Sequence, residues 1–324
     1  MSSAHIPEKP SRESVCAVIP TYNCKGPLSQ LLEVLLLQSR PVDEIIVVDN
    51  ASTDGTEEMI KEKFSGKVNY VRLAENMGGS GGFNVGMRLG CGHGHDWIWC
   101  LDSDALPSEL TLEDLLRAKS MSGSTVVGKT CVLQDPVSHQ TALGGFLADF
   151  RSRKEKADLA DNVSRLGVAS VDFTTLCCLL VKADALEKVD FVNPDFFIYA
   201  DENLLSIRLK RLGEILVVGT TVLHHQFTGC RSSRRGRLRV LREDYWRIYY
   251  LVRNHIVVER EAFGFFRAFT RSVWCYGRNL LGILLFDDSK GYRVGILSKA
   301  LCDGLRNRLG KRISPEQPAA QPRT

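Results

Sequence analysis

Apolar and polar positions alternate with two different periods along the first third of the chain. Short apolar runs, typical of buried strands, are separated by longer segments whose apolar residues recur every three to four positions, as in helices. The predicted strands are residues 15–19, 44–49, 68–73 and 97–101, and the predicted helices are residues 28–38, 53–64 and 82–89. This rhythm predicts an α/β domain with a mostly parallel sheet covered by helices on both faces, the Rossmann-like arrangement.

The pattern becomes less regular after residue 123. We expect strands at residues 125–133, 171–181 and 215–223, an amphipathic helix at residues 201–212, and helices beyond about residue 235. Polar, proline-rich termini predict disorder at residues 1–14 and 311–324. The expected organisation is a nucleotide-binding half (15–122), an acceptor half (123–230), and a basic loop with C-terminal helices (231–310).

Composition and charge add two expectations. Of the 324 residues, 44% are hydrophobic and 25% charged, as in soluble globular proteins. The formal net charge of +4 is small, but seven arginines lie between residues 231 and 247. Such a run could hold a phosphate group or be a solvated surface. Because no nucleic-acid-binding module accompanies it, we expect no nucleic-acid partner.

Cysteine usage and hydropathy bear on the compartment. The ten cysteines include no Cys-x-x-Cys pair, and the N-terminus has no apolar segment of the kind a signal peptide needs. We expect a reducing cytoplasm. Residues 263–286 are apolar but interrupted by Arg267, Arg271 and Arg278, so they are too polar to span a membrane. This helix is expected either to lie on the inner face of a membrane or to dock on the catalytic domain.

The most informative chemistry follows the strand at residues 97–101. Asp102 and Asp104 stand directly after this apolar run, with Ser103 between them. Ligands of open α/β sheets bind outside the carboxyl ends of the strands. Two carboxylates at such a position can share Mg²⁺ or Mn²⁺ with a diphosphate. The pair therefore predicts a divalent metal site.

Two other predicted strands also end in polar segments. The first runs into a proline turn, Pro20-Thr-Tyr-Asn23, where a dinucleotide-binding unit would carry Gly-x-Gly-x-x-Gly. The second ends at Asp49, which is placed to accept hydrogen bonds from a ribose or base. A glycine-rich segment at residues 76–82 precedes a helix, which favours contact between backbone amides and a phosphate.

These segments occur in a familiar order: PTYN (residues 20–23), VDNASTDG (48–55), NMGGSGGF (76–83) and LDSD (101–104). Together they resemble the inverting glycosyltransferases of family 2, which have the GT-A fold. The glycine-rich segment and the Trp-x-Trp before the aspartates look most like the rhamnosyl- and galactofuranosyltransferase members. The resemblance covers residues 15–258 and implies sugar transfer from a nucleoside-diphosphate donor to a glycan or lipid-linked acceptor. The implied donor is dTDP-rhamnose, with UDP-galactofuranose as the alternative.

The resemblance also implies roles for individual residues. Asp104 and His224 would bind Mn²⁺ or Mg²⁺, and His225 would be structural. Thr21 and Asp49 would contact the base and ribose, and Asp102 the sugar-diphosphate. The full expected donor-binding set is Pro20, Thr21, Asn23, Asp49, Asn76, Gly79, Gly81 and Asp102.

A catalytic base is expected in the second half. An inverting transfer needs one carboxylate within reach of the acceptor hydroxyl. Asp201 and Glu202 precede an arginine-containing helix as the family's acidic pair does; Glu202 is the expected base and Asp201 the alternative. The pair could instead only favour the helix N-terminus electrostatically. A non-catalytic sugar-nucleotide-binding scaffold is therefore a competing hypothesis.

Two further segments bear on function. Residues 123–130 match the phosphate-binding pattern Gly-x-x-x-x-Gly-Lys-Thr, but β-branched residues predict a strand there rather than a loop opening a helix, so we expect no ATPase. Residues 249–254, Tyr-Tyr-Leu-Val-Arg-Asn, resemble a Tyr-x-x-Arg-Asn segment that follows the catalytic domain in rhamnosyltransferase-like members.

Overall fold

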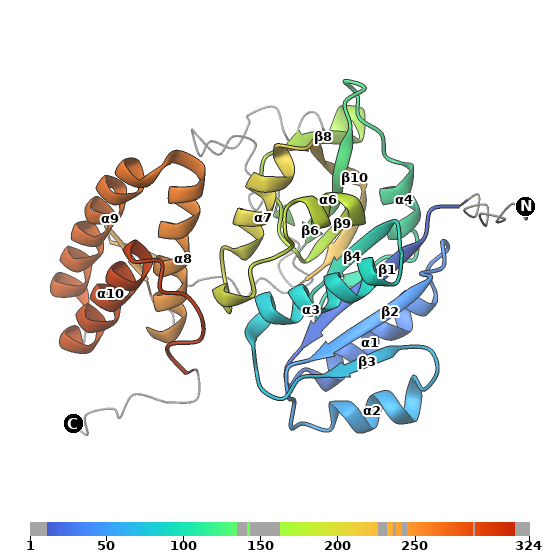
Figure 1. The fold of residues 1–324 in the computed structure, drawn as a ribbon, viewed down its shortest axis with the longest axis horizontal. Coiled ribbons are helices and arrows are strands. Elements are labelled where there is room, and N and C mark those ends of the chain that lie inside the picture. Colours follow the sequence, from blue (N-terminus) through green and yellow to red (C-terminus); the bar gives the residue numbers. More distant parts are fainter. Residues whose placement is uncertain are drawn as a thin grey trace, which may run out of the picture.

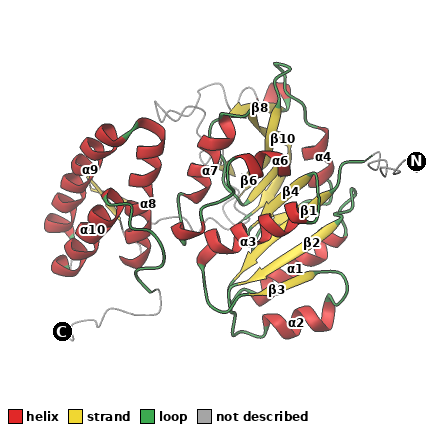
Figure 2. Cartoon of the chain, viewed as in Figure 1, coloured by secondary structure: helices red, strands yellow, loops and turns green. Residues whose placement is uncertain are grey.

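A computed structural model describes residues 12–134, 141–142, 163–225, 232–235, 238–241, 245–287 and 289–314. An α/β domain and a group of three C-terminal helices lie side by side (Figure 1). Figure 2 shows the strands of the α/β domain flanked by helices. The predicted fold class, α/β with a helical C-terminal region, is therefore confirmed.

The central sheet has ten strands in the order β3-β2-β1-β4-β9-β6-β10-β5, with β7 beside β6 and β8 beside β10. Its strands are β1 (Val15–Thr21), β2 (Glu44–Asp49), β3 (Asn69–Arg72), β4 (Trp97–Leu101), β5 (Leu106–Pro107), β6 (Val126–Gln134), β7 (Thr141–Ala142), β8 (Val168–Val171), β9 (Cys178–Lys182) and β10 (Glu214–His224). The helices of this domain are α1 (Lys25–Leu36), α2 (Thr56–Lys63), α3 (Gly78–Gly92), α4 (Thr111–Arg117), α6 (Ala183–Lys188), the short 3₁₀ helix η1 (Pro194–Phe196) and α7 (Asp201–Lys210).

The first half of the sheet is parallel, as predicted. β1 pairs with β2 and β4, and β2 pairs with β3, all in parallel. The register places Thr21 opposite Asp49, so the carboxyl ends of β1 and β2 meet at one edge of the sheet. Every residue of β1 and β4 is buried. The edge that receives Asp102 and Asp104 is thus fixed by a fully packed core.

The second half is mixed rather than parallel. β9 runs antiparallel to both β4 and β6, whereas β6 and β10 are parallel. The strand predicted at residues 171–181 is in fact two strands, because β8 pairs with β10 while β9 pairs with β4 and β6. The chain must leave the sheet between them. Residues 126–134 form a strand. The Gly-x-x-x-x-Gly-Lys-Thr match at residues 123–130 therefore lies largely in a strand, as predicted, and not in a phosphate-binding loop.

Glycines determine how α3 packs. The helix begins at Gly78, four residues earlier than predicted, so the glycine-rich segment is its first turn and not a loop before it. A Cβ atom at Gly82 would lie 2.6 Å from Cβ of Pro20, and one at Gly86 would lie 2.3 Å from Cγ1 of Val18. Glycine at this four-residue spacing therefore lets α3 lie directly on β1.

The C-terminal region contains α8 (Tyr245–Phe263), α9 (Phe265–Phe286) and α10 (Lys290–Leu305), as its apolar periodicity predicted. Ahead of them, β11 (Ser232–Arg235) and β12 (Leu238–Leu241) pair antiparallel, in a segment predicted as a basic loop and helix. The side chains of the arginine run at residues 231–242 lie outside the described residues. No helix within the described ranges is long and apolar enough to cross a membrane.

Part of the segment predicted as a disordered C-terminal tail has a defined place in the structure. Residues 311–314, expected to be disordered, lie against α8, where the hydroxyl of Tyr250 donates a hydrogen bond to the carbonyl of Ile313 at 2.9 Å. The backbone N–H of Arg312 in turn donates to the Tyr250 hydroxyl at 3.1 Å. These contacts anchor the segment to the helix.

Candidate active site

Asp102 and Asp104 lie at the carboxyl edge of the sheet, immediately after β4. Their side chains are 41% and 39% exposed, so both carboxylates can reach a ligand. β4 is held between β1 and β9 and all five of its residues are buried. The predicted pair is therefore delivered to the surface by a rigid strand.

The structure brings His225, and not His224, to the two aspartates. Nε2 of His225 lies 3.2 Å from Oδ1 of Asp104 and 3.7 Å from Oδ2 of Asp102. His224 is the last residue of β10, is exposed, and pairs with Leu106 in β5. Successive side chains of an extended chain point in opposite directions, so only one of the two histidines can face the aspartates. His225 therefore replaces His224 as the candidate metal ligand.

Cys177 also reaches this edge, although the sequence did not single it out. Its sulfur lies within 4.8 Å of ligand atoms of both Asp102 and His225. Antiparallel pairing places Cys178 opposite Leu101, so the preceding residue, Cys177, lies beside Asp102. Only the register of β9 on β4 places Cys177 beside Asp102, and the sequence alone does not reveal that register. Burial raises the pKa of the Cys177 thiol, and Asp102 raises it further.

The two aspartates have different electrostatic surroundings. The hydrogen bond from His225 lowers the pKa of Asp104, and this outweighs the opposing effect of desolvation. Desolvation raises the pKa of Asp102, although the nearby His225 acts in the opposite direction. Asp104 is therefore the carboxylate that stays ionised most readily.

This donor set fits a divalent cation. Carboxylate oxygens suit Mg²⁺ and Mn²⁺, and an imidazole nitrogen favours Mn²⁺ over Mg²⁺. Two ligand atoms held at right angles about 2.1 Å from an ion would be about 3 Å apart. The 3.2 Å between Nε2 of His225 and Oδ1 of Asp104 matches that separation. These two residues, with Asp102, are the ones that could hold the metal.

Asp201 and Glu202 begin helix α7. Asp201 is buried and Glu202 half-buried. Burial raises the pKa of Glu202 well above its ordinary value, Asp201 raises it further, and Asp102 adds a smaller contribution. Because Asp102 also raises the pKa of Glu202, we treat the acidic pair and the predicted metal residues as one candidate site.

Two buried hydroxyls lie where the donor is predicted to bind. Thr21 ends β1 and is 2% exposed, and Ser80 lies in the first turn of α3 and is fully buried. Within the described ranges, neither Oγ1 of Thr21 nor Oγ of Ser80 has a hydrogen-bond partner. Buried hydroxyls are almost always hydrogen-bonded, so these two are exceptions, and both lie beside predicted donor-binding residues.

Asp49 has a structural role at this edge. It is fully buried. Its carboxylate accepts hydrogen bonds from the Ser52 backbone N–H at 2.8 Å, from the Tyr70 hydroxyl, and from Nη1 of Arg72 at 3.1 Å. A contact between Asp49 and the donor would require one of these partners to move. Its binding role therefore stays a prediction, while Arg72, which the sequence did not single out, is 39% exposed beside it.

Asn23 and Asn76 shape the loops around the site. Oδ1 of Asn23 accepts a hydrogen bond from the Thr53 N–H at 2.7 Å, which ties the loop after β1 to the loop after β2. Oδ1 of Asn76 accepts from the Gly78 N–H at 2.8 Å, at the start of α3. Both side chains thus position backbone at the predicted donor site.

The remaining predicted donor residues line the start of α3. Pro20 packs against Gly82, and a Cβ atom at Gly81 would lie 2.6 Å from Cβ of Met77. Open space lies beside Gly79. Of these positions, only Gly79 leaves room for another group at its Cα.

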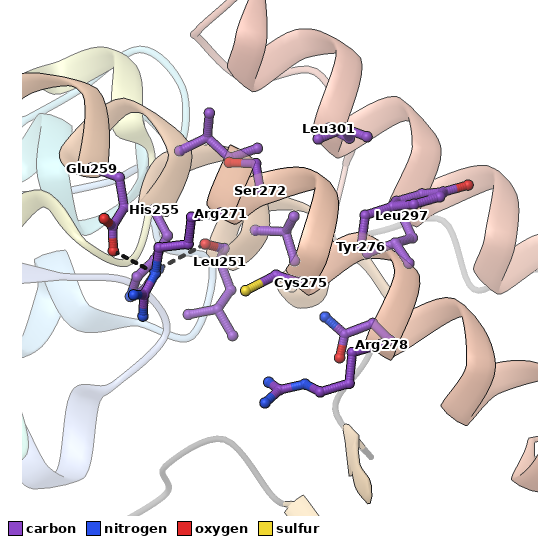
Figure 3. Close-up of a pocket in the computed structure, with 13 residues that line it drawn as sticks. Leu251, His255, Glu259, Arg271, Ser272, Cys275, Tyr276, Arg278, Leu297 and Leu301 are labelled. Carbon is purple, nitrogen blue, oxygen red and sulfur yellow. Dashed lines mark hydrogen bonds and ion pairs between the residues drawn. The ribbon is translucent and has the colours of Figure 1, made fainter. Parts of the chain in front are cut away.

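A separate cavity of about 310 Å³ lies between α8, α9 and α10 (Figure 3). Glu259 of α8 and Arg271 of α9 form an ion pair of 3.0 Å in its wall. None of the predicted catalytic, donor-binding or metal residues is among the described residues that line it. The cavity is therefore distinct from the acidic edge of the sheet.

The sheet order, the aspartates after β4 and the acidic pair on α7 define a nucleotide-sugar-dependent glycosyltransferase of the GT-A type. The family model described as Glycosyl transferase family 2 matches residues 16–166. The chain is 32% identical over 206 residues to the galactofuranosyltransferase GlfT1 of Mycolicibacterium smegmatis, covering 62% of this chain and 67% of that protein. The chain belongs to glycosyl transferase family 2.

Other relatives agree with this assignment. The galactofuranosyltransferase GlfT1 of Mycobacterium tuberculosis is 31% identical over 207 residues, which cover 62% of this chain and 66% of that protein. Residues 1–349 of S. aureus TarS superpose with a TM-score of 0.59 at 15% identity, covering 91% of this chain and 82% of that one. The mannosyltransferase PcManGT from Pyrobaculum calidifontis, in complex with GDP-Man and Mn²⁺, gives 0.52 at 18% identity, covering 92% and 77%. At these identities the two structures support the fold alone.

Proposed function

We propose that this glycosyltransferase is metal-dependent and inverting, and that it transfers galactofuranose from a UDP-linked donor to an acceptor hydroxyl. The cluster of Asp102, Asp104 and His225 beside the acidic pair on α7 is the observation that carries the proposal. The similarity to two galactofuranosyltransferases favours UDP-galactofuranose over dTDP-rhamnose, which the motifs had placed first. TarS has also been solved in complex with UDP and with UDP-GlcNAc.

The chemistry assigned to the site is an in-line displacement. One carboxylate of the Asp201–Glu202 pair accepts the proton of the acceptor hydroxyl as its oxygen bonds to the anomeric carbon. The bond between that carbon and the diphosphate oxygen breaks, and the nucleoside diphosphate leaves. A divalent cation held by Asp104 and His225, with Asp102, would neutralise the charge on the leaving group.

The raised pKa of Glu202 suits this role. A general base works best when its pKa lies near the working pH, and burial beside Asp201 moves Glu202 in that direction. Asp201 remains the alternative base, because it adjoins Glu202 and raises the pKa of that carboxyl group.

The test is calorimetric titration with UDP and with dTDP, each with and without Mn²⁺, followed by turnover of UDP-galactofuranose. We expect Mn²⁺-dependent binding of UDP that is lost in Asp104→Asn. Asp184→Asn, the same change at an exposed position on α6, is the matched control. Donor binding without turnover, with any acceptor glycan, would favour the scaffold. If dTDP binds more tightly than UDP, dTDP-rhamnose would be the favoured donor.

We further propose that α9 rests on an anionic membrane surface, where a lipid-linked acceptor would be found. All of α9 is described, and its only buried residues are Ala268, Ser272 and Gly282. The segment from residue 262 to 286 has three arginines and no acidic residue. The exposed apolar side chains of α9 are Phe265, Phe266, Phe269, Val273, Trp274, Leu281, Leu284, Leu285 and Phe286. Aromatic and apolar residues with arginine beside them are typical of helices that lie in the membrane interface.

A further inference from the structure

The loop that precedes Asp201 has a strained backbone. Three non-glycine residues have positive φ: Phe197 (φ 68°), Tyr199 (φ 67°) and Ala200 (φ 63°). Phe197 has ψ −60° and is the centre of a γ-turn, in which the N–H of Ile198 donates to the carbonyl of Phe196 at 2.8 Å. Such conformations persist only where the surrounding structure holds them, and they gather at functional sites.

Asn254 on α8 holds this loop from one side. Its side chain is fully buried, and Nδ2 lies 3.0 Å from the carbonyl oxygen of Phe196 and 2.8 Å from those of both Ile198 and Tyr199. Oδ1 accepts a hydrogen bond from Nε of Arg253 at 2.8 Å, which fixes the orientation of the amide. One side chain therefore binds three carbonyls of the strained turn.

Arg253 extends the same clamp. It too is fully buried, and Nη2 donates to the carbonyls of Phe196 at 3.0 Å and Asp195 at 3.2 Å. Nη1 donates to the carbonyl of Gly310 at 2.6 Å. The guanidinium lies 4.8 Å from the ring centroid of Tyr250. A buried arginine needs such a complete set of partners, and two of those of Arg253 are backbone carbonyls of η1, directly before the strained loop.

The start of α3 holds the loop from the opposite side. The backbone N–H of Ser80 donates to the carbonyl of Phe197 at 3.2 Å. A Cβ atom at Gly78 would lie only 2.0 Å from that same carbonyl oxygen. The loop is thus enclosed between α8 and the first turn of α3, where the donor is proposed to bind.

We propose that Arg253 and Asn254 are positioning residues, which hold residues 196–200 in the strained conformation that directs Asp201 and Glu202 toward the acceptor hydroxyl. The inference rests on the proposed function. It gives the C-terminal helices a part in the reaction, because α8 supplies the clamp.

The test is Asn254→Asp, which keeps the size of the side chain but places a carboxylate oxygen against three carbonyls. A misplacement of about 1 Å at the reacting groups costs about 10²-fold in rate. We therefore expect kcat to fall by about 10²-fold, with the donor KM and the Mn²⁺-dependent UDP affinity unchanged. Asn279→Asp makes the same change on α9, away from the loop, and should keep the wild-type kcat.

Hydrogen exchange supplies a readout that needs no activity. We expect amides of residues 198–204 to exchange faster in Asn254→Asp, and also in Arg253→Lys, at temperatures where both remain folded. A wild-type kcat and unchanged local exchange in either folded variant would overturn the proposal. Equal losses of kcat and UDP affinity, in proportion to a lowered melting temperature, would also overturn it. Wild-type protein that turns over no donor would count against the proposed function, whereas the exchange result would still decide the clamp.

Discussion

Nε2 of His225 lies 3.2 Å from Oδ1 of Asp104, although the two residues follow different strands of the sheet. The short strand β5 explains the contact, because it follows the aspartates directly and pairs antiparallel with the end of β10. The pairing of Leu106 with His224 leaves His225 as the next residue, beside the aspartates. The contact between these two candidate metal ligands thus depends on a two-residue strand.

His225→Ala should weaken Mn²⁺-dependent UDP binding by at least about tenfold, which is about 1.4 kcal/mol. The loss follows from removing the only imidazole near Asp104 among the described residues. His224→Ala is the matched control, because His224 is exposed at the end of β10. Calorimetry with UDP and Mn²⁺ measures both. A greater loss in His224→Ala would reverse the assignment of the two histidines.

Glu202→Gln and Asp201→Asn should separate the two candidate bases. Removing a general base lowers the rate by roughly 10²–10⁴-fold. Because the pKa of Glu202 is raised, we expect wild-type kcat/KM to fall on acidification at a pH well above the ordinary pKa of a glutamate. The pH–rate profile of each variant, measured with saturating Mn²⁺, identifies the base. If Glu202→Gln keeps both the rate and the acidic limb, Asp201 is the base.

Glu202→Gln should also stabilise the metal-free protein at neutral pH. When folding raises the pKa of a carboxyl group, the protein loses stability as the pH rises. The loss begins near the pKa of the group in the unfolded state and is complete above its pKa in the folded state. Glutamine does not titrate, so the variant avoids that loss. We expect equal stability in acid, where Glu202 is protonated in both states, and a more stable variant near neutrality. Urea unfolding at the two pH values measures the difference, and a gain that is independent of pH would show that ionisation of Glu202 is not its cause.

Local sequence patterns were sufficient for the elements that frame the site. The buried runs at residues 44–49 and 97–101 form β2 and β4 with those same bounds. Each run is apolar and ends at polar or charged residues, so its limits are set by its own composition. The carboxyl edge, and with it the placement of Asp102 and Asp104, followed from the alternation of strands and helices.

Features that depend on distant pairing could not be predicted in this way. The choice between His224 and His225 depends on the register of β5 on β10, and the position of Cys177 depends on that of β9 on β4. The glycines of α3 indicated a phosphate loop, yet several serve close packing against β1. The periodicity of apolar residues reports on one segment at a time, whereas each of these contacts joins two separate segments of the chain.

Gly78→Ala should destabilise the protein and Gly79→Ala should not. Gly78 has φ +75°, and an added Cβ atom would lie 2.0 Å from the carbonyl oxygen of Phe197. Strain and overlap together should cost about 2–3 kcal/mol. Gly79 is helical with open space beside its Cα, so alanine there should be neutral or stabilising by up to about 1 kcal/mol. Melting temperatures of the two variants give the comparison, and equal destabilisation would show that the helix start, not the contact with Phe197, is the sensitive feature.

Phe266→Glu combined with Trp274→Glu should abolish binding to anionic vesicles. Both side chains are exposed on α9, by 79% and 63%. A large apolar side chain contributes about 1.5–3 kcal/mol when it leaves water, so the two changes should lower vesicle partitioning by at least about 10²-fold. Co-sedimentation with phosphatidylglycerol-containing vesicles measures the loss. Leu37→Glu, at a 65% exposed leucine after α1, is the control for added charge and should bind as wild type.

Lipid composition and protein concentration distinguish the membrane from other partners of α9. The helix segment carries three arginines and no acid, so binding should decrease in vesicles of phosphatidylcholine alone and at high salt. If the apolar face of α9 instead joins two copies of the chain, the molecular mass in solution will depend on protein concentration and fall to that of a monomer in the double variant. If the wild-type protein stays monomeric and does not bind anionic vesicles, neither a membrane nor a second copy of the chain covers α9. The acceptor would then have to be sought among glycans free in solution.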